Sequence, residues 1–192
     1  MQTYHAFEGP WRILPWPASS TVTLHGRAGI GASSIAALLR PAVWITLDQS
    51  LNGARDLLQR IHPQPATRIF TAKTAEDILQ ILEQVTVGPL VVDAITALDP
   101  TDAERAFWAL DQWAKKNQAH VCLVLQSKLD GQVHRHLPIL HLAEANIQLS
   151  SGSGDLRTFR VVRSRWSDEQ AVSWKMDACG RPILLSGDAH AH

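Results

Sequence analysis

The chain has 192 residues, of which 45% are hydrophobic and 19% charged, a composition that suits one globular domain with a substantial core. Its 18 basic and 18 acidic residues cancel, so no overall charge draws it toward nucleic acid or an anionic membrane. Two cysteines give no sign of a disulfide framework, and no apolar run approaches the roughly 18 residues of a membrane span. Since we also find no signal peptide, we expect a cytoplasmic protein.

The first 20 residues are rich in residues that break regular structure and in large aromatics. They include three prolines and two tryptophans, namely Pro10, Pro15, Pro17, Trp11 and Trp16. We expect the tryptophans to pack against the rest of their own domain. The predicted organisation is an N-terminal arm at residues 1–20, a core domain at 21–186 and a flexible tail at 187–192.

A glycine-rich segment follows the arm and separates an expected strand at residues 21–25 from an expected helix that starts at Ser33. Gly26 and Gly31 enclose four residues, which is the spacing of a phosphate-binding loop between a strand and a helix. Glycine permits backbone angles that let successive N–H groups point at an anion, and the start of the helix adds N–H groups of its own. The segment therefore predicts a phosphate cradle.

One residue of this motif is changed. The pattern requires a lysine directly after the second glycine, but the chain has Ala32 there, while the hydroxyl expected to hold Mg²⁺ is present in Ser33. Without the ammonium group we expect weaker nucleotide binding and a larger loss of hydrolysis, because charge at the γ-phosphate must be stabilised in the transition state. The alternative is a glycine-rich turn that never binds phosphate.

Polar side chains also follow three apolar runs that read as buried strands, at residues 42–47, 90–93 and 120–125. The first run leads to Asp48 and Gln49, the second ends on Asp93, and the third leads to Gln126. Ligands on parallel sheets bind at the carboxyl ends of the strands, so we expect these side chains to converge with the phosphate loop.

Helices are expected between these strands, at residues 52–61, from the N-cap Thr74 onward, and at 102–116. A polar loop is expected at residues 129–138. Further strands are predicted at residues 68–71, 145–149, 156–165 and 171–176. Strand–helix alternation followed by a run of strands predicts an α/β fold, mainly a parallel sheet extended by antiparallel C-terminal strands.

In this order the segments resemble the core of the RecA superfamily, and within it the RadA/KaiC-like branch. The resemblance implies a RecA-like three-layer α/β/α fold and covers roughly residues 20–180. It rests on a Walker A-like loop, a strand ending in acidic residues, a Walker B-like strand and a late basic strand, at residues 24–31, 44–50, 90–98 and 156–166.

The resemblance implies a role for each motif. Ser33 and Asp93 are expected to hold Mg²⁺, with no other metal, and Gln126 to sense the γ-phosphate. The catalytic glutamate falls at Asp48, which is one methylene shorter, or at Gln49, which cannot act as a base. ATP is expected to be weakly bound or absent. The nucleotide-binding positions are Gly26, Gly29, Gly31, Ala32, Ser33 and Ser34.

Basic residues later in the chain take two further roles by resemblance. Arg163 and Arg165 correspond to fingers that reach a neighbouring subunit's nucleotide, and the expected polar loop takes the place of a DNA-contacting loop. The loop's candidate residues are Lys128, His134, Arg135 and His136. The alternatives are ordinary ones: solvated charges on an edge strand and a loop, a helix cap at Asp93 and a turn residue at Asp48.

Three functions are compatible with these residues. The first is a RecA-like accessory protein, a pseudo-ATPase, in DNA recombination, repair or replication, which self-associates or joins a catalytic partner. The second is an active ATPase that obtains its missing cation from Arg27 or from a neighbour's lysine. The third is a protein-interaction module on the same fold, such as a SulA-like cell-division inhibitor, which binds neither nucleotide nor DNA. Fold does not decide among them.

Overall fold

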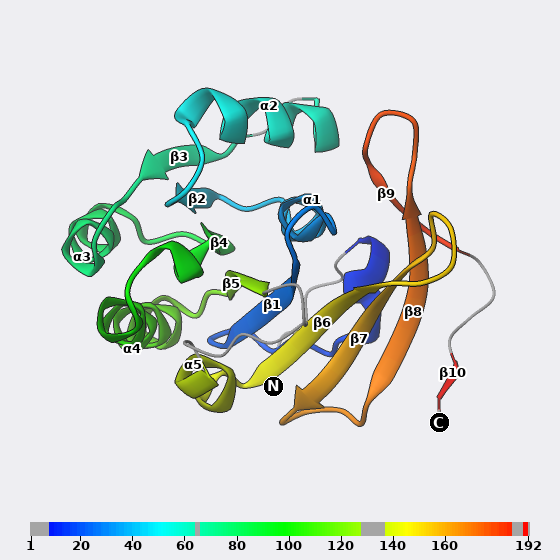
Figure 1. The fold of residues 1–192 in the computed structure, drawn as a ribbon. Helices are drawn as coiled ribbons and strands as arrows, with labels where there is room; N and C mark the ends of the chain where they lie inside the picture. The colour runs from blue at the N-terminus through cyan, green and yellow to red at the C-terminus, as the bar shows by residue number, and fades with distance from the viewer. Residues whose placement is uncertain (1–7, 64–65, 128–136, 186–189, 192) are drawn as a thin grey trace.

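A single twisted sheet forms the centre of the protein in the computed structural model, which describes residues 8–63, 66–127, 137–185 and 190–191 (Figure 1). Its strands are β1 (Thr21–Arg27), β2 (Val43–Thr46), β3 (Arg68–Thr71), β4 (Leu90–Asp93), β5 (Val121–Ser127), β6 (Ala145–Ser151), β7 (Arg157–Ser164), β8 (Gln170–Met176), β9 (Pro182–Leu184) and β10 (His190–Ala191). The helices are η1 (Gly9–Ile13), α1 (Ala32–Ala37), α2 (Leu51–Ile61), α3 (Ala75–Gln84), η2 (Ile95–Ala97), α4 (Pro100–Asn117) and α5 (Leu137–Leu142).

The sheet has the order β10-β8-β7-β6-β1-β5-β4-β2-β3, and β9 pairs with β8. All pairs from β3 through β6 are parallel, whereas β7 and the strands beyond it are antiparallel. The predicted fold class, a mainly parallel sheet with an antiparallel C-terminal extension, is therefore confirmed. The strand of the phosphate loop, β1, lies between β5 and β6.

Two apolar cores cover the two faces of the sheet, which makes the fold three-layered. One core joins η1, α1 and α2 to the sheet, and the other joins α3, α4 and α5 to its opposite face (Figure 1). All four residues of β2 and of β4 are buried, as expected for parallel strands that are covered by helices on both sides.

The described part of the N-terminal arm belongs to the first core. Trp11 and Trp16 are 0% and 1% exposed, and their rings lie 5.3 Å apart. The indole N–H of Trp11 donates to the carbonyl of Ile35 in α1 at 2.7 Å. As predicted, these tryptophans pack against their own domain, and Trp11 is bonded directly to α1.

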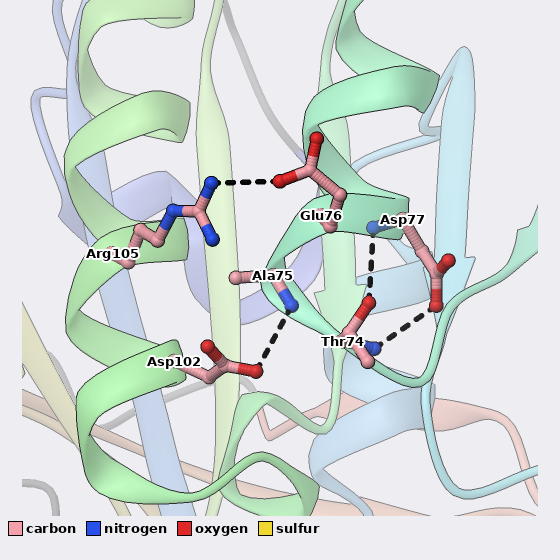
Figure 2. Close-up of polar contacts among 6 residues, drawn as sticks. All are labelled: Thr74, Ala75, Glu76, Asp77, Asp102 and Arg105. Carbon is pink, nitrogen blue, oxygen red and sulfur yellow. Dashed lines mark hydrogen bonds and ion pairs between the residues drawn. The ribbon is translucent and has the colours of Figure 1, made fainter.

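The start of α3 is fixed by its own side chains and by α4 (Figure 2). Thr74 Oγ1 accepts from the N–H of Asp77, and the Asp77 carboxylate accepts from the N–H of Thr74, which together form a capping box. From α4, Asp102 accepts from the N–H of Ala75 at 3.4 Å, and Arg105 pairs with Glu76 at 2.7 Å. The predicted N-cap at Thr74 is confirmed.

Some boundaries differ from those expected. The helix α4 begins at Pro100, two residues before the predicted start, because Asp99 caps it and proline is compatible with the first turn. The polar loop expected to reach residue 138 is shorter, since α5 begins at Leu137. Most of the predicted tail lies outside the described residues, although His190 and Ala191 pair with β8. None of the helices in the described ranges combines the length and apolar character that crossing a bilayer requires.

Candidate phosphate-binding site

A cavity of about 430 Å³ lies at the carboxyl ends of the parallel strands. The phosphate-like loop and α1 form one side, α2 forms another, and residues from β7, β8 and the turn before β9 complete the wall. Of the residues predicted from the sequence, the structure brings the following to this cavity: Gly26, Gly29, Gly31, Ala32, Ser33, Ser34, Gln49, Asp93 and Gln126. The expected convergence of strand ends is therefore present in the fold.

Two glycines of the loop are required by its backbone and its packing. Gly31 has a φ of +98°, and a Cβ there would overlap the methyl group of Met176. Gly26 has no room for a side chain either, because a Cβ there would lie 2.8 Å from a methyl of Ile30 and 3.0 Å from the Cβ of Leu149. At these two positions a side chain would collide with packed neighbours, so the loop requires glycine there. The helix that follows, α1, has only six residues.

The methyl group of Ala32 lines the cavity where the motif requires an ammonium group. Among the described residues, the cationic side chains that line the cavity are three arginines, Arg27, Arg60 and Arg157. Arg27 and Arg60 are exposed, whereas Arg157 is half-buried. The cavity therefore has positive charge, but not at the position from which a Walker A lysine acts.

Asp93 is 1% exposed and forms a hydrogen bond with the hydroxyl of Ser33. Burial raises the pKa of the Asp93 carboxyl from 3.8 to about 7, the bond with Ser33 opposes this rise, and the charge of Asp48 adds to it. The side-chain amide of Gln49 donates to Asp93 at 3.4 Å. A substantial fraction of the Asp93 carboxyl is thus protonated at neutral pH.

Ser33 and Asp93 fit Mg²⁺ only in company with phosphate oxygens. Mg²⁺ is commonly held by one or two carboxylates together with substrate phosphates, and a hydroxyl and a carboxyl in contact match that pattern. In the parts of the chain that the structure describes, no group of three or more His, Cys, Asp or Glu side chains could hold a metal ion.

The candidate catalytic residues form a second hydrogen-bonded pair at the rim. The side-chain amide of Gln126 donates to the carboxylate of Asp48 at 2.8 Å, and both side chains are exposed. The backbone N–H of Gln49 donates to Thr46 Oγ1 at 3.1 Å, which fixes the turn after β2. One oxygen of the short carboxylate is thus already occupied by an amide of the same chain.

Three side chains at this site were not predicted from the sequence. Arg157 in β7 and Trp174 and Met176 in β8 all lie against Gly31. The signal for Arg157 is its spacing of two from Phe159, which places both side chains on one face of the strand, and Phe159 is buried. An arginine on the same strand face as buried residues needs a hydrogen-bond partner, and Arg157 finds one in the carbonyl of Ile30 in the loop.

The remaining predicted residues lie elsewhere. Arg163 pairs with Asn146 near the start of β6, so it lies at the edge of the sheet opposite the cavity, and its guanidinium donates to the carbonyls of Leu140 and His141. Arg165 is exposed and follows β7 at that same edge, where its N–H donates to the carbonyl of Glu144. The candidate DNA-loop residues Lys128, His134, Arg135 and His136 lie outside the described residues.

Solved structures with the same fold include an ATPase domain, a recombinase and a replicative helicase. The chain is similar to the ATPase domain with TM-score 0.69 and 12% identity, and the match covers 88% of this chain and 85% of that one. It is similar to the RadB recombinase, with TM-score 0.67, 18% identity, and coverage of 85% and 90%. A DnaB-like replicative helicase, described together with its interactions with primase, gives TM-score 0.70 at 12% identity and covers 88% of this chain. The chain spans 59% of that helicase.

These similarities confirm the resemblance at the level of the fold: the chain has a RecA-like fold. No protein-family model matches the sequence, and no curated protein is significantly similar to it. Sequence identities of 12% to 18% establish a shared fold but do not establish a shared activity. The function has to be argued from the cavity itself.

Proposed function

We propose that this chain is a RecA-like accessory subunit in DNA recombination, repair or replication, which binds nucleotide phosphates weakly and hydrolyses ATP slowly or not at all. The proposal rests on the residues of the cavity, where groups that bind phosphate are present and groups that promote hydrolysis are altered. The glycine loop and the Ser33–Asp93 contact are kept, while Ala32 has replaced the lysine and the Asp48 carboxylate accepts from Gln126. Binding groups are retained and catalytic groups are weakened.

The magnitudes favour binding over turnover. A hydrogen bond to a charged group contributes roughly 1.5–3 kcal/mol, so the missing lysine costs about one to two decades of affinity. Hydrolysis loses more, because the lysine also stabilises charge that develops on the γ-phosphate in the transition state. The Asp48 carboxylate, which is one methylene shorter than that of a glutamate, reduces the rate further.

An accessory role requires a partner, and we propose that the chain self-associates or joins a catalytic RecA-like protein. Arg163 and Arg165 lie at the edge of the sheet opposite the chain's own cavity, so a nucleotide that they contact would have to belong to another subunit. They are the proposed trans-acting fingers. A role in DNA metabolism is supported by the RecA-like fold, which the recombinase and helicase neighbours share.

Calorimetry with ATP-γ-S and Mg²⁺ tests the proposal on the wild type and on Ala32→Lys. We expect weak binding by the wild type and affinity about 10 to 100 times higher for Ala32→Lys, with little ATP turnover in either protein. Wild-type turnover of about 1 s⁻¹ or more, abolished by Asp93→Asn, contradicts the proposal and supports the active ATPase instead.

The balanced charge of the chain favours a second candidate, a protein-interaction module. This candidate predicts that neither the wild type nor Ala32→Lys binds nucleotide and that the protein does not bind DNA. The same calorimetry, with a DNA-binding assay at low salt, separates it from the accessory subunit.

A further inference from the structure

We infer that Arg157 is the phosphate-binding cation of this cavity, supplied by β7 of the same chain in place of the lysine that Ala32 lacks. The inference rests on the proposed nucleotide binding and assigns the residue that makes it possible. It is independent of whether ATP is hydrolysed.

The sheet places Arg157 beside the loop although it is 125 positions from Ala32 in the sequence. Arg157 is the first residue of β7 and pairs with Ser151 at the end of β6. In turn β6 is parallel to β1, with Leu149 opposite Gly26. Because β7 runs antiparallel, its beginning lies at the carboxyl ends of the parallel strands, where the cavity is.

Two contacts hold the guanidinium of Arg157 at the loop. Its Nη1 donates to the carbonyl of Ile30 at 3.0 Å and lies 3.1 Å from the position of a Cβ on Gly31. Its central carbon is 5.2 Å from the ring centre of Trp174, its cross-strand partner in β8. The group is therefore positioned before any ligand arrives, which lowers the entropy cost of binding.

The chemistry of a guanidinium suits this task. It carries five N–H donors in a planar fork, of which the contact to Ile30 uses one, and the fork matches two oxygens of a phosphate. Half-burial of Arg157 reduces competition from water, whereas Arg27 and Arg60 are exposed. Arg157 is thus the cavity arginine that combines restricted motion with contact to the loop.

The charge balance of the cavity also favours an anion. Arg27, Arg60 and Arg157 face the two carboxyl groups that line the same cavity, Asp56 and Asp93. Asp56 is exposed on α2, and Asp93 is buried beside Ser33. Of the described side chains that line the cavity, three are thus cationic and two are carboxyl groups, while the Asp48 carboxylate at the rim accepts from Gln126.

The test compares three single variants by calorimetry with pyrophosphate and with ATP-γ-S and Mg²⁺. Arg157→Met keeps the apolar stem on Trp174 and removes the charge, and Arg157→Lys keeps the charge without the fork. Arg160→Ala is the matched control, because this arginine lies on the same strand but is exposed and pairs with Glu169 at 2.7 Å. We expect Arg157→Met to weaken binding 10- to 100-fold, Arg157→Lys less, and Arg160→Ala by less than about twofold.

A double variant asks whether the two cations do the same job. If they do, Ala32→Lys should raise the affinity by a larger factor in the Arg157→Met background than in the wild type, whereas equal factors mean that the two cations act independently and overturn the replacement. Urea unfolding of each protein shows whether the variants are folded. If Arg157→Met does not fold, Arg157→Lys provides the test.

The outcomes separate this inference from the proposed function. Unchanged affinity in folded Arg157→Met overturns the inference and leaves the accessory subunit intact. Rapid wild-type turnover overturns the accessory subunit, while a loss of affinity in Arg157→Met still supports the inference. If the wild type binds neither pyrophosphate nor ATP-γ-S, the inference is overturned and a non-catalytic interaction module remains.

Discussion

Replacing Asp93 by asparagine should change the stability of the protein in a pH-dependent way. Burial raises the pKa of this carboxyl to about 7 in the folded state, against 3.8 when it is free. The folded protein therefore keeps a proton that the unfolded chain releases above about pH 4. The contribution of this carboxyl to the free energy of unfolding falls as the pH rises from about 4 to about 7. It changes little above that, because the carboxyl is then deprotonated in both the folded and the unfolded state.

The size of the effect follows from the two pKa values. At about 1.4 kcal/mol per pH unit, the ionised carboxyl costs about 4 kcal/mol at pH 8 and about 1 kcal/mol at pH 4.5. The asparagine of the Asp93→Asn variant has no proton to lose, but it has nearly the same shape and can accept from Gln49. Relative to wild type, the free energy of unfolding of Asp93→Asn should therefore be higher by about 3 kcal/mol more at pH 8 than at pH 4.5.

Urea unfolding followed by tryptophan fluorescence, in EDTA and at both pH values, measures this difference. Asp168→Asn is the control for loss of a negative charge, because Asp168 is exposed and distant from the cavity wall. An equal effect of Asp93→Asn at the two pH values would refute the reasoning, since it would mean that the folded state does not retain the proton. A constant offset added to the expected difference of about 3 kcal/mol reflects altered hydrogen bonds and leaves that difference, which is the tested quantity, unchanged.

Three further changes test the helix cap, the glycine loop and the core, each by urea unfolding. Thr74→Ala should cost about 1 kcal/mol because it removes the cap of α3, whereas Thr86→Ala, at an exposed threonine, should cost little; equal effects would contradict the capping role. Gly31→Ala should be more destabilising than Gly29→Ala, since both have positive φ but only Gly31 also lacks space; the reverse order would contradict the packing. Trp11→Ala should cost about 3–5 kcal/mol, and a cost below about 1 kcal/mol would show that the arm is not part of the core.

Much of the site's framework could be predicted from local patterns. Each parallel strand is a short apolar run that ends at a polar residue, and in a parallel sheet all such ends meet at one edge. This is why Gly26, Asp93 and Gln126 could be expected near one another without any knowledge of the strand order. The cap at Thr74 is equally local, because it depends on residues no more than three positions apart.

The rest depends on register, which the sequence does not state. Arg157 reaches Gly31 only because β7 folds back along β6 with Arg157 opposite Ser151. Farther along the pair, the register shifts between Asn146 and Ile147, and this irregularity changes which β7 residues share a face of the sheet beyond it. The interaction of Gln126 with Asp48 likewise joins residues 78 positions apart. Helix α5 was not predicted, because the polar loop was expected to extend to Pro138, whereas the first turn of a helix accepts proline.

The central place of β1 has a consequence for synthesis on the ribosome. Thr21 pairs with Val121 and Val22 with Ala145, so this early strand has neither neighbour until about a hundred further residues have been made. At about 5–20 residues per second, the wait is on the order of 5 to 20 s or more. During that time an apolar strand has two open edges, which is a hazard for aggregation.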